Sequence, residues 1–265
     1  MRAGVSTACF YPLELENAFE ALASRGVRIA EIFVNTDSEL HDPYLSEMLA
    51  VQREYGVKVG SVHPYTCPIE PMMLFSSYER RLTDMIEYYK HLWEYMNKFG
   101  AKYFIFHGNK VQHLCPEERY FERFLAIQNA AEEFGVTVVQ ENVAYCMSKD
   151  PDFLGRMSAA LGEKASFVLD TKQANRAGYD PLDFVKALGD RIVHVHYSDH
   201  GRKGDCLKFD DGEYDNHTFF SELKKCGFKG NAVIELYKGS YDSADDLADN
   251  YKKLDNFLKE NSFSE

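Results

Sequence analysis

Short apolar runs recur along the chain, and all but the first follow an amphipathic stretch that ends close to a glycine. Glycine is common after a helix because it adopts the left-handed backbone conformation without a Cβ clash. Short runs rich in Val, Ile and Phe are typical of strands buried on both faces of a parallel sheet. The pattern predicts eight strands, at 5–9, 27–34, 57–63, 101–107, 136–141, 165–170, 191–196 and 231–235.

The segments between these runs carry apolar residues at helical spacing. The clearest stripe consists of Tyr78, Leu82, Met85, Tyr89, Leu92, Met96 and Phe99. Such a stripe predicts a helix face that packs on the core, which is a far commoner role than lining a cofactor pocket. Ser243 is an N-cap candidate for a last helix, whose stripe is Leu247, Tyr251, Leu254 and Leu258. Other helices are predicted to open at Pro116, Pro151 and Pro181.

Strands that alternate with helices imply an α/β protein with a parallel sheet, and eight such units can close into a barrel. We therefore predict a single (β/α)8 TIM barrel that forms one domain over residues 1–265. The chain length suits this fold, which typically takes about 250 residues. A doubly wound open sheet fits less well, because no G-x-G-x-x-G follows the first strand and no P-loop is present.

Charge and cysteine content narrow the partners and the compartment. A formal net charge of −12 disfavours nucleic acid and anionic membrane surfaces as partners. The six cysteines form no C-x-x-C pair, which indicates reduced thiols in a cytoplasmic protein. The chain opens with a strand-like segment, and its apolar runs are far shorter than the ~18 residues that span a bilayer. We therefore expect neither a signal peptide nor a membrane span.

Polar residues stand at the C-terminal ends of six consecutive predicted strands, where a barrel carries its catalytic groups. These residues are His63, His107, Glu141, Asp170, His196 and Glu235. Each alone has a structural explanation, such as a hydrogen-bonded histidine or an aspartate that caps the next helix. Together they place three carboxylates at one level, where mutual repulsion raises carboxyl pKa values unless a cation is present. The pattern therefore predicts a divalent metal site.

The seventh predicted strand carries two histidines, His194 and His196. Because side chains alternate in direction along a strand, we expect only one of them to point into the barrel mouth. His196 lies nearer the C-terminal end of the strand and is the predicted metal ligand. His194 is then expected to have a structural role.

Residues in the loops after the strands carry weaker signals. An apolar wall for a sugar could come from Phe10, Tyr11, Phe33 and Tyr65, although ordinary loop packing explains them equally well. Four loop cations could bind a phosphate, but a solvated loop is the better explanation for Lys110, Lys172, Arg176 and Lys203. Whether a sugar substrate is phosphorylated therefore stays open.

The sequence resembles the xylose isomerase-like barrels of the sugar phosphate isomerase/epimerase superfamily over essentially its whole length. The motifs that carry the resemblance are VVQENV at 138–143, LDT at 169–171, HVHYSD at 194–199 and IEL at 234–236. The resemblance implies a metal quartet that consists of Glu141, Asp170, His196 and Glu235. It also implies that Glu141 and Glu235 act as catalytic acid and base on opposite sides of the substrate.

The same resemblance implies residues that surround the substrate. His63 and His107 match positions that line the substrate or bind additional metals, and Arg202 matches a position that contacts substrate hydroxyls. Many members have His three residues after the aspartate of strand six, where this chain has Gln173. Glutamine can bind a sugar hydroxyl but is a poor transition-metal ligand. This departure weakens the case for a multinuclear zinc cluster of the apurinic endonuclease type.

The resemblance implies a metal-dependent isomerase or epimerase that acts on a ketose or aldose, free or phosphorylated, through a metal-stabilised enediolate. Three carboxylates and one imidazole favour Mn²⁺, Mg²⁺ or Co²⁺, and Zn²⁺ is also compatible. One alternative is an inosose-type dehydratase that uses the same metal and glutamates. Less favoured are an apurinic endonuclease-like phosphodiester hydrolase and a non-catalytic barrel, and homo-oligomer formation stays open.

Overall fold

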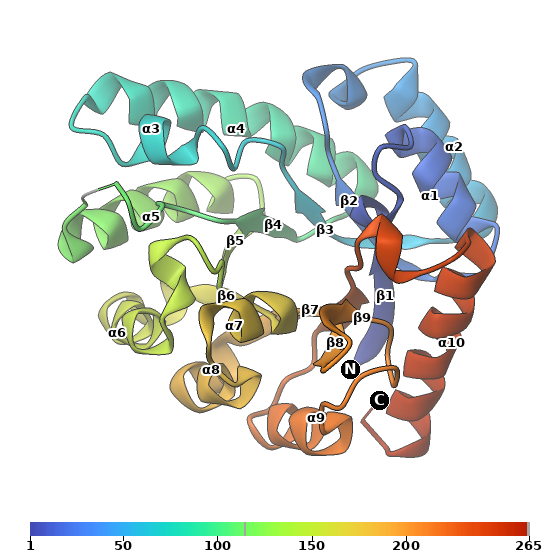
Figure 1. The fold of residues 1–265 in the computed structure, drawn as a ribbon. Coiled ribbons are helices and arrows are strands. Elements are labelled where there is room, and N and C mark those ends of the chain that lie inside the picture. The colour runs from blue at the N-terminus through green and yellow to red at the C-terminus, as the bar shows by residue number, and fades with distance from the viewer. Residues whose placement is uncertain (114, 264–265) are drawn as a thin grey trace.

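The chain folds into a closed barrel of parallel strands surrounded by helices (Figure 1). The computed structural model describes residues 1–113 and 115–263, and these contain eight barrel strands in the order β1-β10-β7-β6-β5-β4-β3-β2. Their bounds are β1 Arg2–Ser6, β2 Ile29–Phe33, β3 Lys58–His63, β4 Tyr103–Phe106, β5 Thr137–Glu141, β6 Ser166–Asp170, β7 Ile192–Tyr197 and β10 Asn231–Ile234. The predicted (β/α)8 barrel is confirmed.

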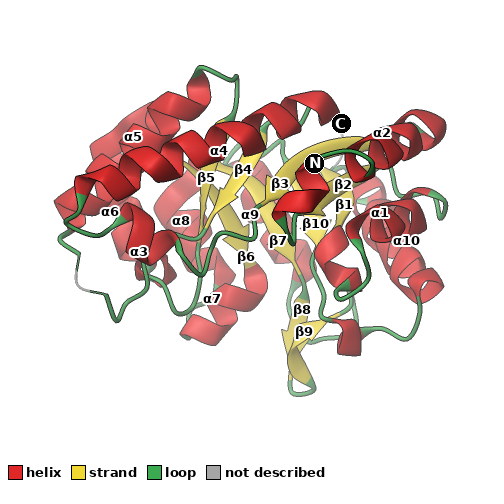
Figure 2. Ribbon diagram, turned by 90° about the horizontal axis from the view of Figure 1, so that it is seen from above, coloured by secondary structure: helices red, strands yellow, loops and turns green. Residues whose placement is uncertain are grey.

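Helices pack around the outside of the barrel (Figure 2). The longer ones are α1 Leu15–Ala23, α2 Tyr44–Tyr55, α4 Glu79–Phe99, α5 Glu117–Glu132, α6 Pro151–Leu161, α8 Pro181–Leu188, α9 Asn216–Lys225 and α10 Ala244–Glu260. Two short helices lie in the loops after β3 and β6, and they are α3 Glu70–Leu74 and α7 Thr171–Ala177. These loops are at the C-terminal ends of the strands, where the candidate site lies.

The apolar stripes correctly predict the two longest helices, except that Tyr78 precedes α4 and is exposed. Tyr89, Leu92 and Met96 are fully buried and form the inner face of α4. Helix α10 begins directly after Ser243, whose hydroxyl accepts a hydrogen bond from the backbone N–H of Asp246 at 3.1 Å. The hydroxyl satisfies one of the backbone donors that the first turn of a helix leaves unpaired, which confirms the predicted N-cap.

The first strand lies three residues earlier than the apolar run at 5–9 predicts. Residues Arg2 to Val5 pair with β10, and the strand ends at Ser6, whose side chain accepts a hydrogen bond from the backbone N–H of Ala8. The next four residues form a 3-10 turn in which Cys9 is fully buried. The apolar pattern therefore continues beyond the strand because this turn also packs into the protein.

A β-hairpin after β7 is a feature that the apolar pattern does not predict. It consists of β8 Asp199–Gly201 and β9 Gly204–Leu207, and Figure 2 shows it extending away from the barrel. Its strands are short and carry no apolar run, so hydrophobic periodicity gives no signal for them.

The barrel interior changes from apolar to polar along the strands. Ile105, Val139 and Val168 form a small cluster of buried apolar residues. This cluster is separate from the main core, which lies between the barrel and the helices. Side chains two residues apart on a strand point to the same face. Glu141 and Asp170 therefore lie one layer above Val139 and Val168, inside the C-terminal mouth of the barrel.

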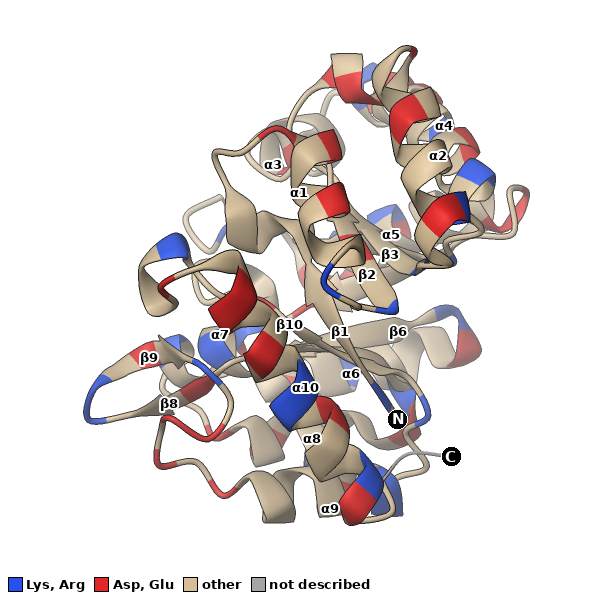
Figure 3. Cartoon of the chain, turned by 90° about the vertical axis from the view of Figure 1, so that its right-hand side faces the viewer, with Lys and Arg blue, Asp and Glu red and all other residues tan. Residues whose placement is uncertain are grey.

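The outer surface carries charges of both signs. In Figure 3, positions of acidic and basic residues are interspersed along helices such as α2, α4 and α10. Pairs one helical turn apart form ion pairs, as between Lys252 and Asp249 at 2.8 Å. Over residues 1–113 and 115–263, no helix is both long enough and apolar enough to cross a membrane.

Candidate metal centre

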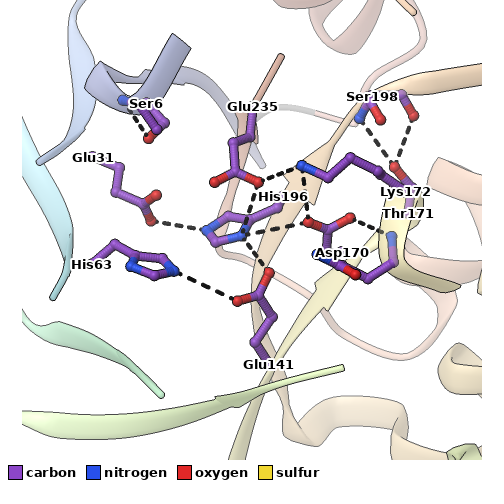
Figure 4. A network of polar contacts seen from close by, with 12 residues as sticks. Ser6, Glu31, His63, Glu141, Asp170, Thr171, Lys172, His196, Ser198 and Glu235 are labelled. Carbon is purple, nitrogen blue, oxygen red and sulfur yellow. Dashed lines mark hydrogen bonds and ion pairs between the residues drawn. The ribbon is translucent and has the colours of Figure 1, made fainter. Parts of the chain in front are cut away.

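The four predicted metal ligands converge at the C-terminal mouth of the barrel. One ligand atom from each of Glu141, Asp170, His196 and Glu235 lies within 4.8 Å of the others. His196 Nδ1 is 3.1 Å from a Glu141 oxygen, 4.0 Å from Asp170 Oδ2 and 3.9 Å from Glu235 Oε2 (Figure 4). Three of these residues are at the ends of neighbouring strands β5, β6 and β7, and Glu235 follows β10. The arrangement brings the whole quartet together.

Asp170 has a different role for each carboxylate oxygen. Oδ1 accepts a hydrogen bond from the backbone N–H of Gln173 at 2.8 Å and thereby caps α7. Oδ2 faces the quartet and is buried without a hydrogen-bond partner. The two explanations that the sequence offers for this residue, helix cap and metal ligand, are therefore compatible in one side chain.

The donor atoms of the quartet fit a divalent cation. Asp170 Oδ2 is buried and has no hydrogen-bond donor, and Glu141 Oε2 is buried with His107 Nε2 2.8 Å away. Burial raises the pKa of Asp170 to about 7, the charges of Glu141 and Glu235 act in the same direction, and Lys172 opposes them. Buried carboxylate oxygens without donors are costly unless a cation neutralises them. A set of three carboxylates and one imidazole suits Mn²⁺, Mg²⁺, Co²⁺ or Zn²⁺.

Glu31 on β2 orients His196 from the side opposite the quartet. Its Oε2 lies 2.9 Å from His196 Nε2, and it also accepts a hydrogen bond from the Ser61 hydroxyl at 2.8 Å. Burial raises the pKa of Glu31, but His196 and His194 outweigh this and hold it well below its usual range. An ionised Glu31 accepts a hydrogen bond from Nε2–H, and Nδ1 faces the quartet, where it would bind a metal in its deprotonated form, as in many metal sites.

His194 also points into the barrel, which corrects the expectation that only one histidine of β7 does so. His194 and His196 are two residues apart, so their side chains are on the same face of the strand. His194 Nε2 lies 3.2 Å from Glu31 Oε2, and the two imidazole rings are 5.2 Å apart. His194 is thus one layer deeper than His196, where it contacts Glu31 and Ser61.

His63 and His107 lie beside Glu141 on the other edge of the quartet. Their Nε2 atoms are 2.9 Å apart, and His107 Nε2 is 2.8 Å from Glu141 Oε2. His63 Nδ1 donates to the carbonyl of Pro64 at 3.1 Å, and its Nε2 faces His107 and the pocket. Both histidines border the pocket described below, at positions that suit contact with a substrate.

Cys67 joins these two histidines in a second group whose ligand atoms could hold a cation. Burial raises the pKa of Cys67, but the charges of His107 and His63 lower it to about 5. A low thiol pKa favours the thiolate, which is the form that binds metals and reacts. The sequence gives no signal for this role, because Cys67 belongs to no spaced motif and meets the histidines only through the loop after β3.

Lys172 lies in the centre of the site, although the sequence favours a solvated loop position for it. Its Nζ is 2.8 Å from Glu235 Oε2 and 3.6 Å from Asp170 Oδ2, and its side chain is 4% exposed. Burial lowers the pKa of Lys172, but Asp170 and Glu235 raise it well above its ordinary value. The difference arises because α7 begins directly after β6, so its first turn directs Lys172 into the barrel mouth.

Gln173 and Arg202 have contrasting positions. Gln173 borders the pocket, and its side-chain oxygen accepts a hydrogen bond from the backbone N–H of Ala144 at 3.1 Å. Arg202 is in the turn between β8 and β9, its side chain is 89% exposed, and its Nε is 3.2 Å from Glu213. The structure does not bring Arg202 to the pocket, because the hairpin extends away from the barrel mouth.

A pocket of about 370 Å³ opens above the quartet. Its aromatic walls are Phe33, Tyr145 and Tyr237, and its polar lining includes His63, His107, Glu141, Lys172, Gln173, Arg176 and Glu235. Arg176 is paired with Asp205 and donates a hydrogen bond to the Tyr237 hydroxyl at 2.7 Å. An apolar groove along Ala8, Tyr11, Phe33 and Leu236 continues from the same side of the pocket. The pocket therefore combines ionisable groups with apolar surface.

Comparison with known proteins gives a family match over most of the chain. The model of the family described as xylose isomerase-like TIM barrel matches residues 19–260. An uncharacterised protein of Mycobacterium leprae is 25% identical over 281 residues, which cover 92% of this chain and 91% of that protein.

Solved structures show the same fold. A D-tagatose 3-epimerase-like protein superposes with a TM-score of 0.79 at 21% identity, over 99% of this chain and 98% of the other. The IolI protein with a bound zinc atom superposes with a TM-score of 0.79 at 18% identity, also over 99% and 98% of the two chains. At these identities the likeness establishes the barrel architecture.

Proposed function

The chain belongs to the xylose isomerase-like TIM barrel family, and on this basis we propose that it is a metal-dependent enzyme that isomerises or epimerises a small sugar. The observation that carries the proposal is the convergence of three carboxylates and an imidazole beneath a pocket, with two of the carboxylates, Glu141 and Glu235, lining that pocket. The epimerase-like and zinc-binding neighbours support it.

The proposed metal ligands are Glu141, Asp170, His196 and Glu235. A bound divalent cation would polarise the carbonyl of the sugar and stabilise the enediolate that forms when the neighbouring carbon loses its proton. The protein residues hold the donor set in place, since Glu31 orients His196 and the cap of α7 orients Asp170.

Glu141 and Glu235 are the proposed acid and base. They come from β5 and from the end of β10, which β6 and β7 separate in the barrel, so they reach the pocket from different directions. Burial raises the pKa of Glu235, but Lys172 and His196 outweigh this and lower it, so that it is a carboxylate able to accept a proton. One glutamate removes the proton next to the carbonyl. The other returns a proton to the adjacent carbon or to the opposite face.

The pocket suits a small sugar as substrate. Its volume of about 370 Å³ is near the lower end of ordinary ligand sites. His63, His107 and Gln173 offer hydrogen-bonding groups for hydroxyls, and Phe33, Tyr145 and Tyr237 offer apolar faces. Both cations of the lining, Lys172 and Arg176, already pair with carboxylates of the protein. An unphosphorylated sugar is thus the simpler fit.

A dehydratase of the inosose type is the second candidate. It would remove the same proton and then expel a hydroxyl from the next carbon. The imidazoles of His63 and His107 favour this alternative, because they border the pocket beside Glu141 and could protonate a leaving hydroxyl. A phosphodiester hydrolase is disfavoured by Gln173, because glutamine is a poor transition-metal ligand at a position where the resemblance implies a histidine in many family members.

The test compares the wild-type protein with Glu235→Gln, and with Glu222→Gln on the surface of α9 as a control. Each protein is assayed with Mn²⁺ in D₂O on free and phosphorylated ketoses and aldoses. An isomeric product with deuterium at the carbon next to the carbonyl supports the isomerase or epimerase, and a dehydrated product supports the dehydratase. We expect Glu235→Gln to abolish deuterium incorporation. Failure of the wild-type protein to bind any added divalent metal contradicts the proposal.

A further inference from the structure

Lys172 has a position that the stability of the fold does not explain. It is in the first turn of α7, where the helix dipole disfavours a positive charge. Its ammonium is buried, which is costly unless carboxylates compensate. The groups around its Nζ belong to the candidate site, namely Glu235 at 2.8 Å, Asp170 at 3.6 Å and the Tyr237 ring at 4.8 Å. A lysine placed at such cost beside two metal ligands indicates a functional role.

The charge balance of the quartet indicates what this role is. Glu141, Asp170 and Glu235 carry three negative charges when they are ionised, and a divalent cation with a neutral His196 leaves one of them uncompensated. Transfer of a substrate proton to one of the glutamates moves a negative charge from that carboxylate onto the substrate within the same pocket. Lys172 supplies the missing positive charge from within the protein. Its contacts with Asp170 and Glu235 place that charge on the ligands themselves (Figure 4).

We propose that Lys172 is a built-in second cation of the centre, which shares Asp170 and Glu235 with the bound metal. It repels the metal and so weakens metal binding, and it offsets the negative charge that develops in the substrate when its proton moves to a glutamate. Lys172 itself transfers no proton in this scheme. The inference rests on the proposed function, because it assumes that the quartet binds a divalent metal.

This role predicts the opposite result from a purely structural one. If Lys172 only stabilised the local fold, its loss would loosen the quartet and weaken metal binding. If its charge opposes the metal, loss of the charge makes metal binding tighter. Arg176 provides a matched comparison, because it is a cation one turn later on α7 that borders the same pocket but pairs with Asp205.

The experiment measures the Mn²⁺ dissociation constant by titration calorimetry for the wild-type protein, Lys172→Met, Lys172→Gln, Lys172→Arg and Arg176→Met. We expect Lys172→Met to lower the dissociation constant by about tenfold. Lys172→Gln keeps a hydrogen-bond donor for Glu235 but removes the charge, so it should lower the constant similarly. Lys172→Arg and Arg176→Met should stay within about threefold of wild type, since neither removes the charge beside the quartet. Circular dichroism verifies the fold of each variant, and Lys172→Gln carries the test if Lys172→Met does not fold.

The outcomes separate this inference from the proposed function. If the wild-type protein binds Mn²⁺ and both uncharged variants bind it equally or more weakly, the inference is overturned. The proposed metal site is then still supported. Binding by the uncharged variants but not by the wild-type protein supports the inference and contradicts metal dependence of the natural chain. Absence of binding in all of them overturns both.

Discussion

Glu31 and His196 are 165 residues apart in the chain, yet Glu31 Oε2 lies 2.9 Å from the imidazole nitrogen that faces away from the quartet. The contact favours a proton on Nε2 of His196 and orients the ring. Mutation of partners of this kind typically lowers metal affinity by about 10- to 100-fold. The geometry of the quartet therefore depends on a residue that is not a ligand of it.

We predict that Glu31→Gln weakens Mn²⁺ binding by about tenfold or more. The amide keeps the shape of the side chain but removes the charge that favours a proton on His196 Nε2. The measurement is the Mn²⁺ dissociation constant. Ser61→Ala is the control, because it removes a donor to Glu31 at 2.8 Å without altering the contact with His196. Equal effects of the two substitutions would argue against a specific role for the contact between Glu31 and His196.

Asp170→Asn should remove the stabilisation that Mn²⁺ gives to the folded protein. A metal at one hundred times its dissociation constant stabilises a native state by about 2.7 kcal/mol, which corresponds to a rise in Tm of roughly 5–10 °C for a chain of this size. Asparagine retains an oxygen that can cap α7, so the change acts mainly on the charge in the quartet. The measurement is Tm by calorimetry with and without Mn²⁺.

Asp180→Asn is the control for this experiment, because Asp180 caps α8 and is not part of the quartet. It should retain the full Mn²⁺-dependent rise in Tm. An undiminished rise in Asp170→Asn would mean that the metal binds elsewhere.

The fold and the convergence of polar residues at the strand ends were predictable from the sequence because both follow from local patterns, whereas the choice of the quartet among those residues came from the family resemblance. Alternating apolar runs and helices imply a parallel barrel, and the ends of its strands lie at one level by geometry. Glu141 and Asp170 occupy such ends, so their convergence requires no knowledge of the loops. The direction of the His194 side chain was predictable as well, because residues two apart on a strand share a face. The expectation that His194 and His196 point in opposite directions was therefore wrong.

The remaining site residues depend on contacts that single-sequence reasoning does not provide. Glu31 lies in the middle of β2, and its meeting with His196 requires the closed barrel. Lys172 reaches Glu235 because α7 starts without an intervening loop, and Cys67 reaches its histidines through an irregular turn. A carboxylate inside the apolar segment IAEIF was the one available signal, because buried glutamate is rare without a partner.

The stability of the metal-free protein should depend on pH through Glu70. This buried carboxylate accepts hydrogen bonds from the backbone N–H of Gly108 at 2.8 Å and from the Tyr89 hydroxyl at 3.1 Å. Burial, and then the nearby Cys67, raises the pKa of Glu70 from 4.5 to about 7. The folded protein thus holds this proton more tightly than the unfolded chain. The resulting stabilisation is complete below about pH 4.5 and is lost as the pH rises to about 7.

Glu70→Gln mimics the protonated form. Its free energy of unfolding should therefore increase relative to that of the wild-type protein as the pH rises through this window. Between pH 5 and pH 8, we expect the free energy of unfolding of the variant to rise by about 1–3 kcal/mol relative to that of the wild-type protein. Urea unfolding with a chelator present gives these values. Glu79→Gln is the control, because a hydrogen bond from Arg123 lowers the pKa of Glu79 and moves its titration below this window. A pH-independent difference for Glu70→Gln would contradict the buried-proton explanation.

Gly108, directly after His107, has a backbone and an environment that only glycine fits. Its φ is +81°, and a Cβ at this position would lie 2.0 Å from the Tyr120 hydroxyl oxygen. That hydroxyl donates to Gln140, whose amide donates to the carbonyl of His107 at 3.0 Å. Gly108→Ala would therefore both strain the backbone and displace the group that supports His107.

We expect Gly108→Ala to lower the free energy of unfolding by about 2–4 kcal/mol. Gly135→Ala separates the two contributions, because Gly135 has a φ of +70° but a Cβ added there would meet no side chain within 4 Å. It should cost about 1 kcal/mol, since it adds backbone strain alone. Urea unfolding of both variants measures the difference. Equal losses in the free energy of unfolding would mean that the Tyr120 hydroxyl moves aside at no energetic cost. The contacts through which Tyr120 and Gln140 support His107 would then not be rigid.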